Sequence, residues 1–168
     1  FNAMLLLGPN KKVKAIGATR LIDAEVPDIT GAILEHTSGA TTYLGCYYFC
    51  PRRGHLNLLG TEGNAMLNLR LPQGDVKDYL IKLLDADSIT DLNIHWKDQA
   101  EPESVDLTHG NMIVEEIKEF VSWVRDGRPS DANPRAGVET LAVILAAVES
   151  METGKAVEME AFLAANGA

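Results

Sequence analysis

The first half of the chain alternates between apolar and polar residues with a period of two. Apolar, β-branched and aromatic residues recur in short runs that Gly, Pro, Ser and Asn separate. This pattern is typical of strands that bury one face. The predicted strands are Val13–Arg20, Ile29–His36, Thr41–Phe49, His55–Leu59, Ala65–Arg70 and Leu92–Trp96.

The connections between these runs carry turn signals. Ser38 and Gly39 punctuate one connection, and Gly60-Thr61-Glu62-Gly63 predicts a hairpin because glycine reaches positive φ without strain. Pro72–Asp75 reads as a further turn. Tyr79–Leu84 is predicted as a strand and Ala100–Asp106 as a polar, extended loop.

The second half changes to a helical period. One apolar stripe contains Ile113, Ile117, Phe120, Val121 and Val124. A helix with this stripe is amphipathic. Gly127 then stands where a helix-ending glycine belongs, and Pro129 prevents continuation.

A second helix is predicted after Asn133-Pro134, with Asn as the N-cap and Pro at the first helical position. Between Val138 and Val148 only Glu139 and Thr140 are polar, so this helix is expected to be buried on more than one side. Gly154 ends it, and Ala156–Glu160 alternates like an edge strand or an inserted strand.

Strands followed by helices predict an α+β fold: one mostly antiparallel open β-sheet with helices packed on one face. The helices suffice for one face only. The other face is expected to carry Cys46 or its neighbours, Tyr47 or Tyr48, with other apolar residues. An uncovered apolar face of this kind usually marks an interface.

Composition narrows the function classes. The 168 residues suit one domain, and a net charge of −9 argues against a nucleic-acid surface. Lys11, Lys12 and Lys14 alternate as a solvated strand face. No apolar run approaches a membrane span. We expect residues 1–3 to be a remnant of expression and residues 4–168 to form a single domain.

The two cysteines are predicted to be free thiols. Cys46 and Cys50 lie in one strand-like run, where four residues span about 13 Å, too far for a disulfide. Reduced cysteines in an acidic chain favour a cytoplasmic location.

The motifs of this sequence identify no metal-binding, cofactor-binding or catalytic residue. Asp85–Asp91 begins like a calcium loop, but Thr90 replaces the required glycine and Trp96 the closing glutamate. The histidines lack H-x-x-x-H spacing, and G-x-S-x-G is absent. G-x-G-x-x-G and a phosphate loop ending in Gly-Lys-Ser or Gly-Lys-Thr are also missing.

The segment from Tyr47 to His55 is chemically the richest. Arg52 and Arg53 offer forked donors for carboxylates or clustered hydroxyls, and Pro51 and Gly54 place them on a turn. An ordinary surface hairpin is the alternative. His109-Gly110-Asn111 opens the amphipathic helix and offers N–H groups to an anion, with plain capping as its alternative.

Several weak motifs occur in a fixed order along the chain: Leu6–Pro9, Lys12–Ala15, Gly60–Gly63, Glu116–Phe120, Gly127–Pro129 and the alanine-rich helix. In this order and spacing they resemble the C-terminal domain of the glucose–fructose oxidoreductase / inositol dehydrogenase / MocA family, which has a dihydrodipicolinate-reductase-like fold. The resemblance implies hydride transfer between NAD or NADP and a sugar, polyol or related hydroxyl compound. It places the catalytic lysine, aspartate and histidine outside this chain.

The same resemblance implies that the loop before the Gly60–Gly63 turn and the start of the amphipathic helix border the substrate cleft. The implied substrate-binding residues are Tyr48, Arg52, Arg53, His55, His109 and Asn111. It also implies a homodimer or homotetramer through the open sheet face. The chain is therefore predicted to be a substrate-binding and oligomerisation domain that lacks its nucleotide-binding partner domain. A free-standing ligand-binding or assembly module without redox activity is the alternative.

Overall fold

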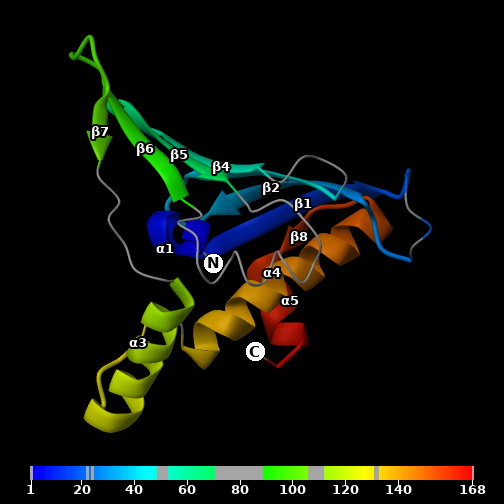
Figure 1. Cartoon of the computed structure of the whole chain (residues 1–168). Coiled ribbons are helices and arrows are strands. Elements are labelled where there is room, and N and C mark those ends of the chain that lie inside the picture. The colour runs from blue at the N-terminus through cyan, green and yellow to red at the C-terminus, as the bar shows by residue number, and fades with distance from the viewer. Residues whose placement is uncertain are drawn as a thin grey trace. The chain divides into compact units, whose positions relative to one another are not determined.

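The computed structural model describes residues 2–21, 23, 25–48, 53–70, 89–105, 112–130 and 133–167. The chain divides into two compact units (Figure 1). The first unit contains Phe1–Phe49 and Pro129–Ala168, and the second contains Cys50–Arg128.

The first unit is built on a four-stranded antiparallel sheet in the order β3-β2-β1-β8. Its strands are β1 (Asn10–Ala18), β2 (Ile29–His36), β3 (Thr41–Tyr47) and β8 (Val157–Glu158). The three strands predicted between Val13 and Phe49 are thus represented by β1, β2 and β3, and β2 matches its predicted bounds. The turn at Ser38-Gly39 is also confirmed, since Gly39 has φ 87°.

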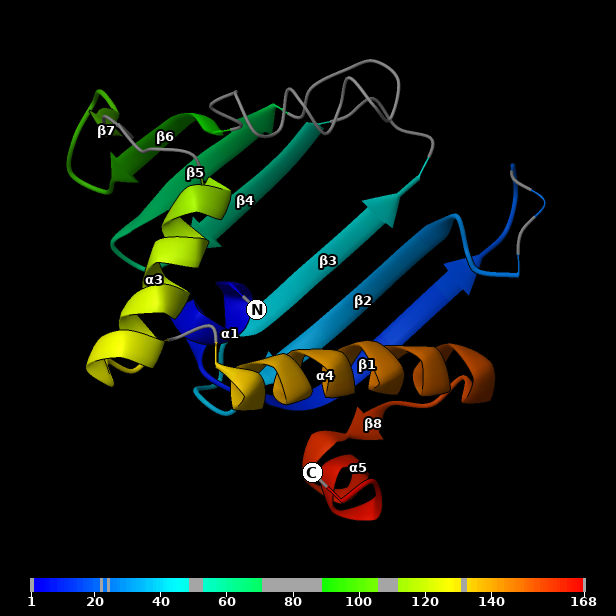
Figure 2. The ribbon, with the colours of Figure 1, turned by 60° about the horizontal axis from the view of Figure 1, so that its bottom comes forward.

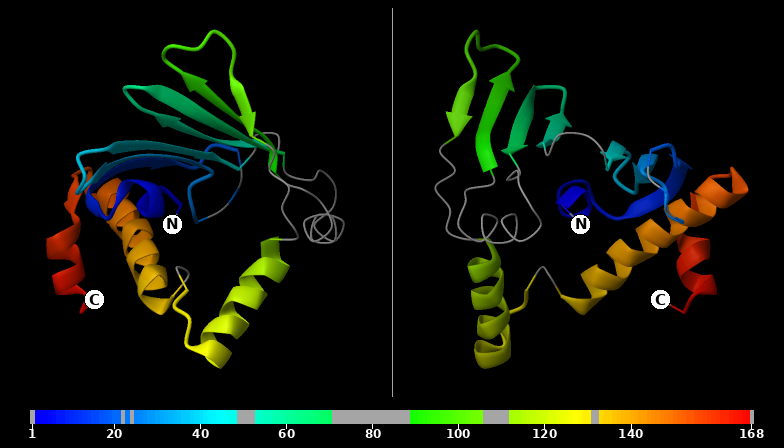
Figure 3. Two further views of the ribbon diagram at one scale, coloured as in Figure 1. Left: turned by 90° about the vertical axis from the view of Figure 1, so that its left-hand side faces the viewer. Right: turned by 45° about the vertical axis from the view of Figure 1, so that its right-hand side comes forward.

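Helices α4 (Pro134–Thr153) and α5 (Met159–Ala165) lie on the same side of this sheet (Figures 2 and 3). The face of α4 that meets the sheet is lined by small residues, Ala142, Ala146 and Ser150, which let the helix approach closely. They pack with a hydrophobic core of Val13, Ala15, Ala32, Leu34, Val157 and Met159.

The ends of α4 follow from local sequence. The Asn133 side chain accepts a hydrogen bond from the N–H of Ala136 at 3.0 Å, and Pro134 is the first helical residue. At the other end Gly154 has φ 68° and donates its N–H to the carbonyl of Ser150 at 3.0 Å. Both predicted caps are confirmed.

The predicted strand Ala156–Glu160 is only partly present. Val157 and Glu158 form β8, but Met159 begins α5. Met159 is buried, and Phe162 and Leu163 pack against the same core, so a helical spacing of three and four residues prevails over the short alternation. At the N-terminal end, α1 (Asn2–Leu7) stops at Gly8, which has φ 87°.

The second unit holds a second antiparallel sheet whose strands follow chain order. They are β4 (Arg53–Leu59), β5 (Gly63–Arg70), β6 (Ile89–Trp96) and β7 (Glu103–Val105). The predicted hairpin is confirmed, because Gly60 donates its N–H to the carbonyl of Gly63 at 2.9 Å. The α+β class is confirmed, with the described strands joined in two sheets where the sequence predicted one.

Two further segments of this unit bear on the predictions. The loop predicted at Ala100–Asp106 contains β7, which pairs with Leu92–Ile94 and was missed because it is polar and short. Helix α3 (Met112–Asp126) matches the predicted amphipathic helix, and Gly127 ends it with φ 66°. The predicted turn at Pro72–Asp75 and strand at Tyr79–Leu84 lie outside the described residues.

Candidate functional site

A polar surface lies on one face of the sheet in the second unit. The register places Leu56, Leu67 and Leu92 opposite one another on one face. The neighbouring positions therefore lie on the opposite face, because successive side chains of a strand alternate. That face carries five polar residues, His55, Asn57, Asn68, Asp91 and Asn93, and Met66 lies between Asn57 and Asn93. We call these five residues the polar face.

Hydrogen bonds organise the centre of the polar face. Oδ2 of Asp91 accepts from Nδ2 of Asn68 at 3.2 Å and from Nδ2 of Asn93 at 3.1 Å. These three side chains are half-buried, whereas His55 and Asn57 are exposed. Asp91 thus fixes the amide groups on either side of it.

The chemistry of this face suits hydroxyl groups. A carboxamide offers two donors and an acceptor oxygen, a carboxylate accepts, and a neutral imidazole does both. Asn and Asp are disfavoured in strands, so their concentration at the centre of a sheet departs from local preference. Departures of this kind are expected at functional sites.

The predicted substrate-binding residues fall in different parts of the chain. Tyr48 follows β3 in the first unit and is 76% exposed. In the second unit, Arg53 begins β4 with its Cα opposite that of Arg70, and His55 belongs to the polar face. Three others lie outside the described residues: Arg52, His109 and Asn111. The substrate role of all six residues stays a prediction.

Four polar-face residues were not among the predicted site residues. Asn57, Asn68, Asp91 and Asn93 accompany His55 only once the strand register is known. The alternation around Asn68 was a usable signal within its own strand. No local pattern linked it to Asp91, which is distant in sequence.

The sheet of the first unit has an apolar open face. Ile33 lies opposite Tyr43 and Ile29 opposite Tyr47, so these side chains share the face away from α4. Ile16 belongs to the same face, and Tyr43 is 80% exposed. By alternation Cys46 points to the helix-bearing side, and Tyr48 lies beyond the end of β3. Tyr47 is therefore the predicted neighbour that occupies the open face.

Charged residues border this open face at one end. Nζ of Lys12 lies 3.0 Å from Oε1 of Glu158 and 3.9 Å from Oε2 of Glu35. The hydrogen bond to Glu158, followed by the negative charges of both glutamates, raises the pKa of Lys12 above its usual value. Ion pairs at this exposed edge are worth little individually.

One buried histidine is structural. His36 is buried, and its Nδ1 donates to the carbonyl of Gly8 at 2.7 Å because a carbonyl can only accept. Its Nε2 lies 2.8 Å from the hydroxyl oxygen of Thr42. The residue fastens the end of α1 to the hairpin of β2 and β3.

The described residues contain no cluster of three or more His, Cys, Asp and Glu side chains arranged to hold a metal ion. Asp91, the last residue of the calcium-like sequence, lies in β6. Among the described helices, none combines the length and apolar character needed to cross a membrane.

Comparison with known families decides the relationship. The family described as "Oxidoreductase family, C-terminal alpha/beta domain" matches residues 2–159. The chain belongs to the Gfo/Idh/MocA oxidoreductase family. The resemblance inferred from the sequence is thereby confirmed. No curated protein matches the chain.

Solved structures support this family fold. A proposed NADPH-dependent oxidoreductase from Desulfitobacterium hafniense DCB-2 aligns with a TM-score of 0.81 and 25% identity, over 96% of this chain and 46% of that one. Aldose-aldose oxidoreductase from Caulobacter crescentus, complexed with glycerol, aligns with a TM-score of 0.72 and 20% identity. The alignment covers 93% of this chain and 43% of that one. An oxidoreductase from Agrobacterium radiobacter, in complex with NAD+, L-tartaric acid and magnesium, aligns with a TM-score of 0.62 and 18% identity. The alignment covers 96% of this chain and 46% of that one. The chain thus spans less than half the length of these proteins.

Proposed function

We propose that this chain is the substrate-binding and oligomerisation domain of an NAD- or NADP-dependent oxidoreductase that acts on a sugar, polyol or related hydroxyl compound. The family match over residues 2–159 carries this proposal. In the aligned oxidoreductases, the chain corresponds to less than half of the protein. The nucleotide would be bound by another part of the parent enzyme, since this sequence contains no dinucleotide fingerprint.

The polar face supports a hydroxyl-rich substrate. Its amide, carboxylate and imidazole groups provide donors and acceptors for a ligand with several adjacent hydroxyls. Two of the aligned proteins were solved with glycerol and with L-tartaric acid, which both carry adjacent hydroxyls. The residues predicted to contribute donors to such groups in the parent enzyme are Tyr48, Arg52, Arg53, His55, His109 and Asn111.

The open face of the first unit supports self-association into a homodimer or homotetramer. Exposed apolar side chains gather there while α4 and α5 cover the opposite face: Ile16, Ile33, Tyr43 and Tyr47. Exposed apolar patches on a sheet usually mark contacts with another protein. A second copy of the chain is the proposed partner.

The decisive experiment compares this chain with its full-length parent. The reading frame upstream of residue 4 should encode G-x-G-x-x-G, an E-K-P-like lysine motif and an Asp/His pair. Calorimetry should detect NADH or NADPH binding to the parent but none to this chain, and only the parent should oxidise sugars or polyols. A parent that neither binds nor reduces a nicotinamide nucleotide would favour the alternative, a ligand-binding or assembly module without redox activity.

The substrate role of the turn can be tested in the parent by replacing Arg52, Arg53 and His55 with alanine. Losing a charged donor to a bound hydroxyl or carboxylate should cost about 1.5–3 kcal/mol in kcat/KM, with the affinity for NAD(P) unchanged. Arg125→Ala is the matched control, because Arg125 is exposed and bonds its neighbour Asp126. If all three variants keep wild-type kcat/KM, the turn is an ordinary surface hairpin.

A further inference from the structure

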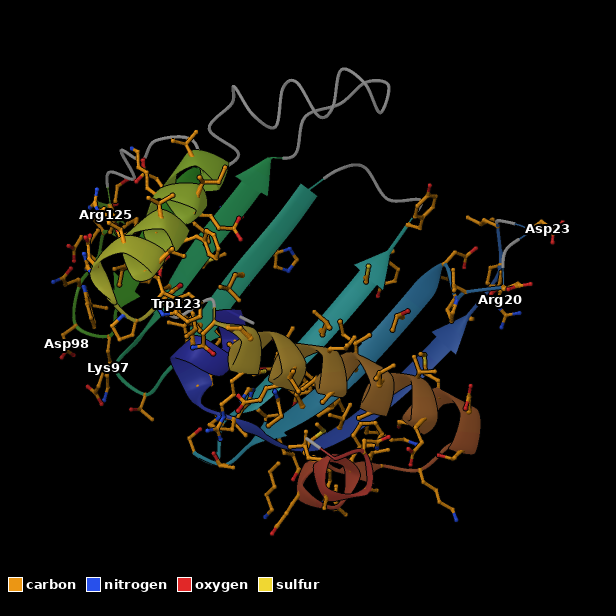
Figure 4. All side chains as sticks on the ribbon, turned by 90° about the horizontal axis from the view of Figure 1, so that it is seen from below. Arg20, Asp23, Lys97, Asp98, Trp123 and Arg125 are labelled. Atoms are coloured by element: carbon orange, nitrogen blue, oxygen red, sulfur yellow. The ribbon has the colours of Figure 1, made fainter. Side chains whose placement is uncertain are left out.

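A buried carboxylate organises the connection between β1 and β2. Asp28 is only 2% exposed, although the neighbouring residues 25–27 are all exposed. Its two carboxylate oxygens each lie 3.0 Å from the backbone N of Arg20, and Oδ2 lies 2.6 Å from that of Leu21. Figure 4 labels Arg20 and Asp23 in this connection. The carboxylate thus supplies acceptors where the β1 ladder has ended.

The backbone of Asp28 joins two further segments. Its N–H donates to the carbonyl of Ala18 at 3.1 Å, and its carbonyl accepts the N–H of Tyr48 at 3.0 Å. Because Ile29 pairs with Tyr47, this last bond continues the ladder between β2 and β3 by one residue. Asp28 therefore connects the ends of three strands at the point where Tyr48 leaves the sheet.

The connection is also packed against the sheet. Oγ1 of Thr19 donates to the carbonyl of Val26 at 3.2 Å, which closes the loop. A Cβ on Gly17 would collide first with Sδ of Met151 in α4, and it would also stand 3.0 Å from Cγ of Pro27 in the loop. A larger residue at position 17 would therefore press on both α4 and the loop that carries Asp28.

We propose that Asp28 is a positioning residue for the substrate site. Its carboxylate binds the backbone N–H groups of Arg20 and Leu21, and this keeps the Asp28 carbonyl within hydrogen-bond distance of the N–H of Tyr48. Tyr48 is a predicted substrate-binding residue, so the inference rests on the proposed function. Asp28 itself touches neither substrate nor cofactor in this role.

The first test uses the chain as it stands. In Asp28→Asn an NH2 group replaces one acceptor oxygen without changing the size of the side chain. The amides of Leu21 and Tyr48 should then exchange about tenfold faster relative to the core amide of Ala15. Asp23→Asn is the matched control, because Asp23 lies in the same connection and is exposed. Unchanged relative protection of Tyr48 in Asp28→Asn would overturn the inference.

The second test uses the full-length enzyme and a double-mutant cycle. Asp28→Asn and Tyr48→Ala should each lower kcat/KM about tenfold and leave NAD(P) affinity unchanged, and the double variant should lose little more than either alone. Additive losses would overturn the positioning role. If Tyr48→Ala lowers kcat/KM and Asp28→Asn does not, only the positioning role fails. If Tyr48→Ala has no effect, the proposed site at Tyr48 fails and the positioning role with it.

Discussion

The replacement Ser150→Ala tests how α4 is held on the sheet of the first unit. Ser150 has no exposed surface, and its Oγ accepts the N–H of Ala15 at 2.9 Å. The same hydroxyl donates to the carbonyl of Lys155 at 2.6 Å. Alanine removes this oxygen and nothing else, so the variant isolates the two hydrogen bonds.

The expected loss follows from the surroundings of the two partners. The N–H of Ala15 is buried, and a buried backbone group without a partner costs about 1–3 kcal/mol. Lys155 is exposed, so its carbonyl can bond water instead. Alanine is a better helix former than serine by about 0.5 kcal/mol, which offsets part of the loss. The free energy of unfolding should therefore fall by about 2 kcal/mol.

The assay must report on the correct unit. Both tryptophans, Trp96 and Trp123, belong to the second unit, so fluorescence would follow the wrong part of the chain. Urea unfolding followed by circular dichroism, together with hydrogen exchange at the amide of Val13, reports on α4 and β1. Thr140→Val is the matched control, because the Thr140 hydroxyl bonds a carbonyl inside the helix, that of Ala136. If Ser150→Ala and Thr140→Val lose the same small amount, below about 0.5 kcal/mol, the hydroxyl does not fasten the helix.

Three further outcomes are expected. The hydrogen bond and ion pair with Glu158 raise the folded-state pKa of Lys12 above its ordinary value of 10.5. The stabilisation that this pair contributes is therefore complete below the ordinary pKa and is lost as the pH rises through the raised pKa. Lys12→Met should therefore flatten the alkaline limb of a stability–pH curve, and an unchanged limb would contradict this. Tyr43→Asp should break an assembly that buries well over about 1,000 Å², giving a smaller mass by light scattering, whereas Leu59→Asp in the second unit should not. Gly154→Ala should lower stability by about 1 kcal/mol in urea unfolding because its φ of 68° disfavours a Cβ; an unchanged midpoint would refute this.

The parts of the fold that the sequence predicts are those with local causes. The cap of Asn133, the proline after it and the glycine at position 154 each act within one turn of α4, so their residue types define the ends of the helix. The strands with alternating apolar residues, such as Ile29–His36, are equally local, because alternation reports a single buried face.

The missed elements have distant causes. Glu103–Val105 contains two polar residues, and it becomes a strand through hydrogen bonds with β6. The start of α5 at Met159 depends on a core formed by α4 and β1, which no window around Ala156–Glu160 contains. Tertiary contacts, and not the local secondary-structure propensity of the sequence, therefore determine both β7 and the start of α5.

The candidate site shows the same limit. His55 was selected from its neighbours in sequence, but Asn68, Asp91 and Asn93 join it through the registers of β4 with β5 and of β5 with β6. A shift of one residue in either register would move these side chains to the other face of the sheet. The polar face is therefore a property of strand pairing, and of its residues only His55 could be named in advance.

Ser150 and Asp28 both accept hydrogen bonds from backbone N–H groups of β1, or of the residues that follow it, that have no partner in a neighbouring strand. β8 pairs only with Lys12 and Val13, so the N–H of Ala15 lies beyond the reach of that short strand, and the Ser150 hydroxyl supplies the acceptor. At the other end the strand finishes at Ala18, and the Asp28 carboxylate takes the N–H groups that follow. Backbone donors need partners whether or not a strand is there to provide them, most of all where they are buried, as at Ala15. A side-chain oxygen outside β1 meets that need in both cases, from α4 for Ala15 and from the β1–β2 connection for Arg20 and Leu21. Neither residue can therefore be recognised from the alternating pattern of the strand it serves.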